Sequence, residues 1–218
     1  MRIRINVTVN KAIQVMLFYL FFVVISTALF GPIFAVFITE SISGATLRTV
    51  GFAVALYGVA KSVLQIPMAR FLDKHKGEKD DFYALMVGAT VAVIYPLGLI
   101  FVSEIWHLYA LEILAGLGDA SLMAAYYSLF ARHVDKGSEG FEWSLFSVGG
   151  LTISSSIGVA IGGVIAEMFG FRFLFGISTI INFLVLFSLF YLYPLLDGAR
   201  PIALPPFSPL PKNPTTKN

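Results

Sequence analysis

The sequence predicts an all-α membrane protein, a bundle of six transmembrane helices with both termini on the cytoplasmic side. Six apolar segments alternate with short polar loops, at residues 12–39, 50–71, 82–102, 105–131, 145–166 and 171–196. Each reaches the roughly 20 residues of helix that cross a bilayer core. Hydrophobic residues make up 57% of the chain and charged residues 13%, which is about half the charged share of soluble domains. The mean hydropathy of +0.83 agrees.

The first segment begins after a basic stretch at residues 1–11, which resembles the start of a signal peptide. Its apolar run of 28 residues is too long for that, because a signal peptide has an apolar region of about 7–15 residues. We therefore expect a retained helix. Gly31-Pro32 interrupts this segment, and such breaks can mark binding sites or gates in transporters.

The second, third and fourth segments carry the ionisable residues discussed below, with Pro67 and Pro96 near segment ends. The fifth segment has a face of small residues, and we expect Gly158, Gly162 and Gly163 to allow close helix packing. After the sixth segment, residues 197–218 form a proline-rich tail that is expected to be disordered and cytoplasmic. The predicted domains are therefore 1–11, 12–196 and 197–218.

The basic residues predict the orientation. Twelve of the 15 Lys and Arg residues lie in the N-terminal segment, the second and fourth loops and the tail, and only Arg48 and Arg172 lie in the alternate loops. Positive charge favours the cytoplasmic side. We therefore expect an integral protein of the plasma (inner) membrane with both termini in the cytoplasm.

Charge and composition exclude several classes of function. A net charge of +2 gives no reason to expect a nucleic-acid partner. The chain has no cysteine, and its three histidines lack ligand spacing, so neither a metal nor a cofactor is expected. An intramembrane protease would need a nucleophile motif together with a histidine inside the membrane. No histidine lies in the middle of an apolar segment, which argues against an intramembrane enzyme.

Two loop motifs carry a resemblance to a known family. The loop after the second segment runs from a helix end through Asp73, Lys74 and Gly77 to Lys79, and the sixth segment opens with Phe169-Gly170-Phe171-Arg172. Together they resemble signatures of the major facilitator superfamily. The resemblance covers all six segments and corresponds to the N-terminal half of a member, since members normally have two six-helix halves. The first loop departs from the pattern by one extra residue and by Ala69 in place of glycine.

The resemblance implies a bundle of two three-helix repeats and a cytoplasmic gating loop. In the family such a loop latches one conformation, and Arg132, in the next cytoplasmic loop, is placed to pair with it. The alternative is a solvated basic loop that only sets the topology.

Three ionisable residues lie inside the apolar segments, namely Lys61, Glu112 and Asp119. Charge in a bilayer is costly, so these side chains should face the interior or one another. Equal depth allows contact between Lys61 and Asp119, and Tyr57 and Gln65 extend a polar stripe along the second segment. We expect a substrate or proton site here. The alternative is a structural ion pair that locks two helices together.

The leading interpretation is secondary active transport of a small solute by alternating access, with proton coupling left open. Because a single six-helix bundle offers no opposing wall, we expect a homodimer or a separately encoded second half. The alternative from another class is a transport-inactive scaffold or a truncated transporter fragment. The sequence does not identify the substrate, and it leaves uniport, symport and antiport open.

Overall fold

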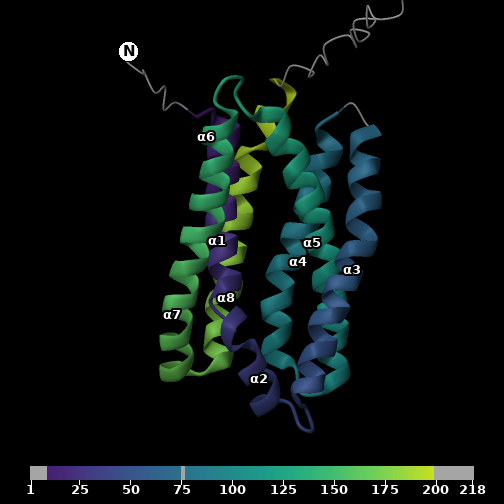
Figure 1. Ribbon diagram of the computed structural model, residues 1–218, viewed down its shortest axis with the longest axis vertical. Coiled ribbons are helices and arrows are strands. Elements are labelled where there is room, and N and C mark those ends of the chain that lie inside the picture. Colours follow the sequence, from purple (N-terminus) through teal and green to yellow (C-terminus); the bar gives the residue numbers. More distant parts are fainter. Residues whose placement is uncertain (1–8, 75–76, 199–218) are drawn as a thin grey trace, which may run out of the picture.

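The computed structural model describes residues 9–74 and 77–198, and within them every regular element is a helix (Figure 1). Six stretches of 21 to 31 residues are long and apolar enough to cross a membrane, which confirms the predicted all-α bundle of six transmembrane helices. Residues 1–8 of the basic N-terminal segment, the loop residues 75 and 76, and the proline-rich tail from residue 199 lie outside the described residues.

The helices follow the predicted segments and extend a few residues beyond most of them. The first span comprises α1 (Lys11–Ala28), η1 (Gly31–Ile33) and α2 (Phe34–Ser41), and the second to fourth are α3 (Leu47–Lys74), α4 (Lys79–Phe101) and α5 (Ile105–His133). The fifth comprises α6 (Glu139–Ser144), the π-helical η2 (Leu145–Ile153) and α7 (Ser154–Phe169). The sixth comprises α8 (Phe171–Leu186) and η3 (Phe187–Tyr191), with the short η4 (Tyr193–Gly198) after it.

The sixth span ends earlier than expected, at Tyr191 instead of residue 196. Pro194 accounts for the break, because proline has no backbone N–H to donate to the carbonyl groups at the end of η3. The chain continues past this point as the separate helix η4, with Pro194 in its first turn.

The six spans form two groups that stand side by side (Figure 1). One group holds α1, α7 and α8, the other holds α3, α4 and α5, and packing of α4 against α8 joins them. The first helix of each three-span repeat therefore packs with the last two spans of the other repeat. This exchange interlocks the repeats, and α1 and α5 also contact each other across the two groups.

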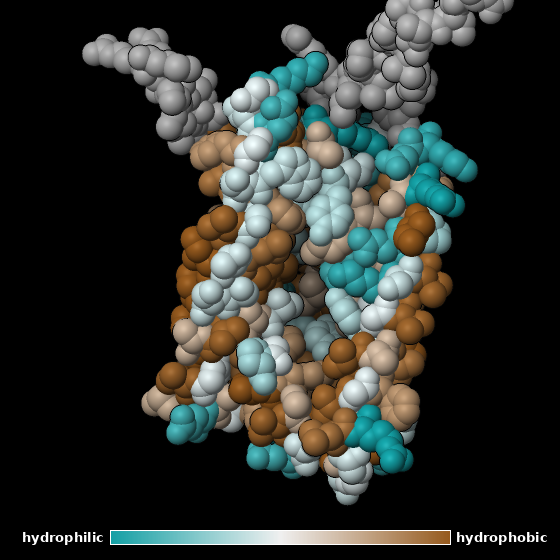
Figure 2. Space-filling model, viewed as in Figure 1, coloured by the Kyte–Doolittle hydropathy of each residue, from teal (hydrophilic) through white to brown (hydrophobic). Residues whose placement is uncertain are grey.

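The outer surface is mainly apolar. Large hydrophobic side chains such as Val59 and Val63 of α3 and Val164 of α7 are more than half exposed. Figure 2 shows hydrophobic side chains along the flanks and hydrophilic ones gathered at the two ends. This distribution matches a bilayer, whose hydrocarbon core replaces water around the flanks.

Glycines bring α7 close to the first span. A Cβ added to Gly162 would lie 1.8 Å from the Leu29 carbonyl oxygen, and one on Gly158 would lie 2.6 Å from that of Ile25. A Cβ on Gly163 would meet nothing within 4 Å, so Gly163 lies outside this contact. The first span also breaks where Gly31-Pro32 predicted, between α1 and η1.

We predict that Gly162→Ala destabilises the protein and that Gly163→Ala does not. Both substitutions raise helix propensity equally, but only the first forces a methyl group into the backbone of α1. Overpacking of this kind costs about 1–3 kcal/mol. Thermal unfolding in detergent should show a lower Tm for Gly162→Ala only, and equal Tm values for the two variants would contradict the close packing.

Candidate functional site

A cavity of about 440 Å³ lies between the two groups of helices. Its wall is formed by residues of the first span, α3, α4, α5 and α8. The polar and aromatic residues of the wall are Thr27, Phe30, Phe34, Tyr57, Tyr95, Glu112, Asp119 and Asn182. The face in Figure 2 is hollowed between the groups. The break in the first span contributes to this wall, because Phe30 and Gly31 both line the cavity.

Asp119 of α5 pairs with Lys61 of α3. Lys61 Nζ lies 2.6 Å from Asp119 Oδ2, and the Tyr57 hydroxyl donates a hydrogen bond of 2.5 Å to the same oxygen. The Lys61 and Asp119 side chains remain 30% and 24% exposed. The contact that equal depth allowed is therefore present, and the pair stays accessible.

A glycine on α5 allows this contact. A Cβ on Gly116 would lie 2.4 Å from the Tyr57 carbonyl oxygen and 2.9 Å from the Ala60 Cβ. The backbone of α3 therefore runs directly over α5 one turn before Asp119. Sequence analysis missed Gly116, although a glycine within the apolar pattern of a helix signals a close approach of this kind.

Glu112 is in a different environment from Asp119. It is 3% exposed, and its Oε1 accepts a hydrogen bond of 2.6 Å from the Tyr95 hydroxyl of α4. Among the described residues it has no basic partner within 4.0 Å. The two carboxylates lie on the same face of α5 but have different partners, since Asp119 pairs with a cation and Glu112 accepts a hydrogen bond from a hydroxyl.

Asn182 of α8 adds an amide to the cavity wall. It is 2% exposed, and its Nδ2 donates to the Ala92 carbonyl oxygen at 2.7 Å. Its Oδ1 has no hydrogen-bond partner among the described residues. Sequence analysis missed both Tyr95 and Asn182. An asparagine in the middle of the sixth apolar segment was the available signal.

Gln65 does not join this group. It is half-buried on α3, one turn beyond Lys61, and it forms no hydrogen bond with another described residue. It is also not part of the cavity wall. The polar stripe predicted on α3 therefore reaches the cavity only through Tyr57 and, through its ion pair, Lys61.

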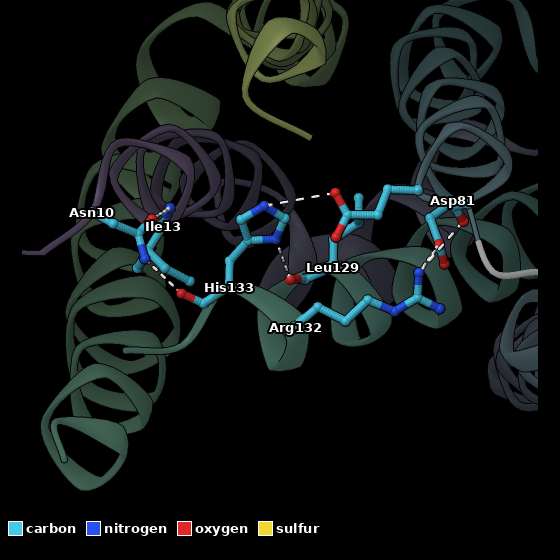
Figure 3. Close-up of polar contacts among 8 residues, drawn as sticks. Asn10, Ile13, Asp81, Leu129, Arg132 and His133 are labelled. Atoms are coloured by element: carbon cyan, nitrogen blue, oxygen red, sulfur yellow. Dashed lines mark hydrogen bonds and ion pairs between the residues drawn. The ribbon is translucent and has the colours of Figure 1, made fainter. Parts of the chain in front are cut away.

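A second cluster of polar residues connects helix ends at the end of the bundle where α1 begins, and it is called the helix-end network below (Figure 3). Arg132 Nη1 of α5 donates to Asp81 Oδ2 of α4 at 2.9 Å and to the Gly77 carbonyl oxygen at 3.4 Å. The Asp81 side chain is only 1% exposed. Arg132 thus reaches the predicted loop at its backbone, and its carboxylate partner is Asp81.

The other predicted loop residues are exposed. Asp73, Lys74 and Lys79 form no hydrogen bond or ion pair with the rest of the described chain. Lys74 is the last residue of α3 and Lys79 the first of α4. Of the loop residues named from the sequence, Gly77 and Arg132 are the two that the structure brings together.

Asn10 connects the first span to the same network through hydrogen bonds. Its Oδ1 accepts the Ile13 backbone N–H at 3.0 Å and caps α1, while its Nδ2 donates to the His133 carbonyl oxygen at 2.5 Å. His133 Nε2 lies 3.8 Å from Glu78 Oε2. Sequence analysis missed Asn10, although an asparagine just before an apolar run is a typical helix cap.

Comparison with known proteins identifies the family. No curated protein matched the chain. The family model of the Major Facilitator Superfamily matches residues 16–216, which include the cavity and nearly all of the six spans. This match confirms the resemblance carried by the two loop motifs. The chain belongs to the major facilitator superfamily, and it is an integral membrane protein that functions in membrane transport of a solute.

Proposed function

We propose that the protein is a secondary active transporter that moves a small solute by alternating access, with the cavity as the substrate site. Asp119 and Glu112 are its central groups, together with Tyr57 and Lys61. The observation that carries this proposal is a cavity of about 440 Å³ that holds two carboxylates. Ionisable groups at membrane depth are costly and mark substrate or proton pathways.

The exposure of the ion pair favours function over a purely structural lock. A pair that only joined two helices would be expected to be covered, whereas Lys61 and Asp119 keep 30% and 24% of their side-chain surface exposed. A ligand or a proton entering the cavity can therefore compete with Lys61 for Asp119. Such exchange at a carboxylate is also a route for proton coupling.

Alternating access needs a second body that closes the other side of the cavity. We propose a second six-helix unit for this role, either a second copy of this chain or a separately encoded half. The largely exposed surface of α3 beside the cavity supports the proposal, because only Thr49, Ala53 and Leu72 of its 28 residues are buried.

We also propose that the end carrying the network is cytoplasmic and that the network is a gate in the plasma (inner) membrane. The distribution of Lys and Arg supports the orientation. Asn10, which caps α1, and His133 on α5 link helices of the two groups at this end. The network would hold these helices together in one state and separate in the other.

We predict that Asp119→Asn lowers solute flux at least about tenfold, because hydrogen bonds to charged groups contribute about 1.5–3 kcal/mol. The amide also leaves Lys61 without its counter-charge. Counter-flow in proteoliposomes, with and without a pH gradient, measures the effect. Glu104→Gln is the matched control, since Glu104 is exposed at the start of α5 and outside the cavity. Unchanged flux in Asp119→Asn would move the substrate site elsewhere.

We predict that transport-competent particles contain two six-helix units, because one bundle cannot close the cavity against both sides. Photobleaching of labelled chains in native lipid should show two steps for a homodimer. For a heteromer it should show one step, with a second polypeptide present. Flux by liposomes that each hold one copy and no other protein would refute the second unit.

We predict that the loops containing Ser43 and Lys136 lie on opposite sides of the membrane. In a chain without native cysteine, a membrane-impermeant maleimide should label Lys136→Cys from the cytoplasmic side and Ser43→Cys from the other.

We also predict that Arg132 helps to close the cavity on the cytoplasmic side. Thr27 lies in the cavity wall, and adding Arg132→Gln to Thr27→Cys should increase the cytoplasmic labelling of that cysteine severalfold.

Arg132→Lys is the control for this gating effect, because it keeps a cation beside Asp81. Its Thr27→Cys labelling should stay near that of the parent. Equal labelling of the Arg132→Gln and Arg132→Lys variants would show that the ion pair does not gate the cavity. Labelling of Lys136→Cys from the outer side would reverse the proposed orientation.

A further inference from the structure

The charges of the cavity wall do not balance. Its acidic side chains are Glu112 and Asp119, and among the described residues no Lys, Arg or His belongs to the wall. Lys61 lies beside the wall and compensates Asp119 at 2.6 Å. Glu112 receives only the neutral Tyr95 hydroxyl. One carboxylate therefore faces the cavity without an opposite charge among the described residues.

An uncompensated carboxylate at this depth favours a cationic ligand. Glu112 is 3% exposed, so water solvates it poorly, and a charge in such a place is stabilised by a partner of opposite sign. An entering anion would meet the same carboxylate as a repulsive charge. Within the described part of the chain the nearby cation is Lys61, and it is already paired with Asp119.

A residue of the cavity wall also carries an acceptor without a hydrogen-bond partner among the described residues. Asn182 uses its Nδ2 to donate to the Ala92 carbonyl oxygen, and its Oδ1, buried in the cavity wall, receives no hydrogen bond from a described residue. Glu112 and Asn182 together offer acceptors to a ligand. The complementary ligand is one that carries N–H donors.

The rest of the wall suits an apolar body beside the cationic group. Phe30, Phe34, Tyr57 and Tyr95 bring aromatic rings to the cavity, and its other members are mainly Val, Ala, Leu and Met. Aromatic faces attract cations, as the Lys61 ammonium shows at 5.8 Å from the centre of the Tyr57 ring. A volume of about 440 Å³ is in the range of small-molecule sites.

We infer that the substrate is a protonated organic amine with an aromatic or aliphatic body, which places its ammonium group at Glu112 and donates to Asn182 Oδ1. This inference rests on the proposed transport function and adds the chemical class of the solute. Glu112 fixes the charge of the substrate, and the aromatic wall accommodates its apolar part.

The test compares three series of probes that share the same apolar body and differ in the polar end group, which is cationic, neutral or anionic. Phenylalkyl chains of two to four carbons ending in an amine, an alcohol or a carboxylate are titrated into the purified protein at pH 7, and binding is measured by calorimetry. The amines should bind at least about tenfold more tightly than the matched alcohols, as expected for a charge-assisted contact. The carboxylates should bind most weakly.

Variants assign the selectivity to Glu112. Glu112→Gln keeps an acceptor for the Tyr95 hydroxyl but removes the charge, so amines and alcohols should bind it equally. Glu104→Gln changes an exposed carboxylate outside the cavity and should keep the preference for amines. Thermal unfolding of each variant verifies that the fold is retained.

Each outcome bears on a distinct claim. Equal binding of amines and alcohols by the unmodified protein, or tighter binding of carboxylates, overturns the amine assignment and leaves the transport proposal standing. A folded Glu112→Gln variant that still prefers amines also overturns it. Absence of binding by all three series contradicts the cavity as a substrate site, and the amine assignment falls with it.

Discussion

Lys61 and Asp119 meet at 2.6 Å on neighbouring helices, at a depth where an isolated charge of either sign is costly. Their mutual compensation lets α3 and α5 carry charge beside the central cavity, with the Tyr57 hydroxyl as a third member. Because Lys61 is engaged there, it does not compensate Glu112, which lies two turns earlier on α5. The electrostatic character of the cavity thus depends on which carboxylate Lys61 reaches.

That geometry depends in turn on how closely the helices approach. In lipid no hydrophobic effect drives helices together, so packing and polar contacts must do so, and small residues shorten the distance. Gly116 places α5 against the backbone of α3, and Gly162 places α7 against the first span. The two contacts lie in different groups of helices and fix the walls on either side of the cavity. This close approach of α3 and α5 lies one turn from the Lys61–Asp119 pair.

The network at the N-terminal end shows how a side chain selects its partner. Sequence reasoning expected Arg132 to pair with the loop after the second segment, as the equivalent loops of the family can, without fixing which carboxylate is its partner. In the structure, Arg132 pairs with Asp81, whose side chain is 1% exposed, while Asp73 is exposed. A buried carboxylate gains more from a cation than a hydrated one does, since water already stabilises the hydrated charge. Burial depends on packing, which no loop motif encodes.

The sequence by itself determined the number of spans, the break at Gly31-Pro32, the family and the presence of charge at membrane depth. These follow from hydropathy, from backbone chemistry and from local motifs, all of which are properties of contiguous residues. Helical spacing also placed Glu112 and Asp119 on one face. Only the tertiary structure decided that Asp119 has a cation beside it, that Glu112 has none among the described residues, and that Asn182 lines the same cavity from α8. Helical periodicity determines the depth and direction of a side chain, but its neighbours depend on which helices pack together.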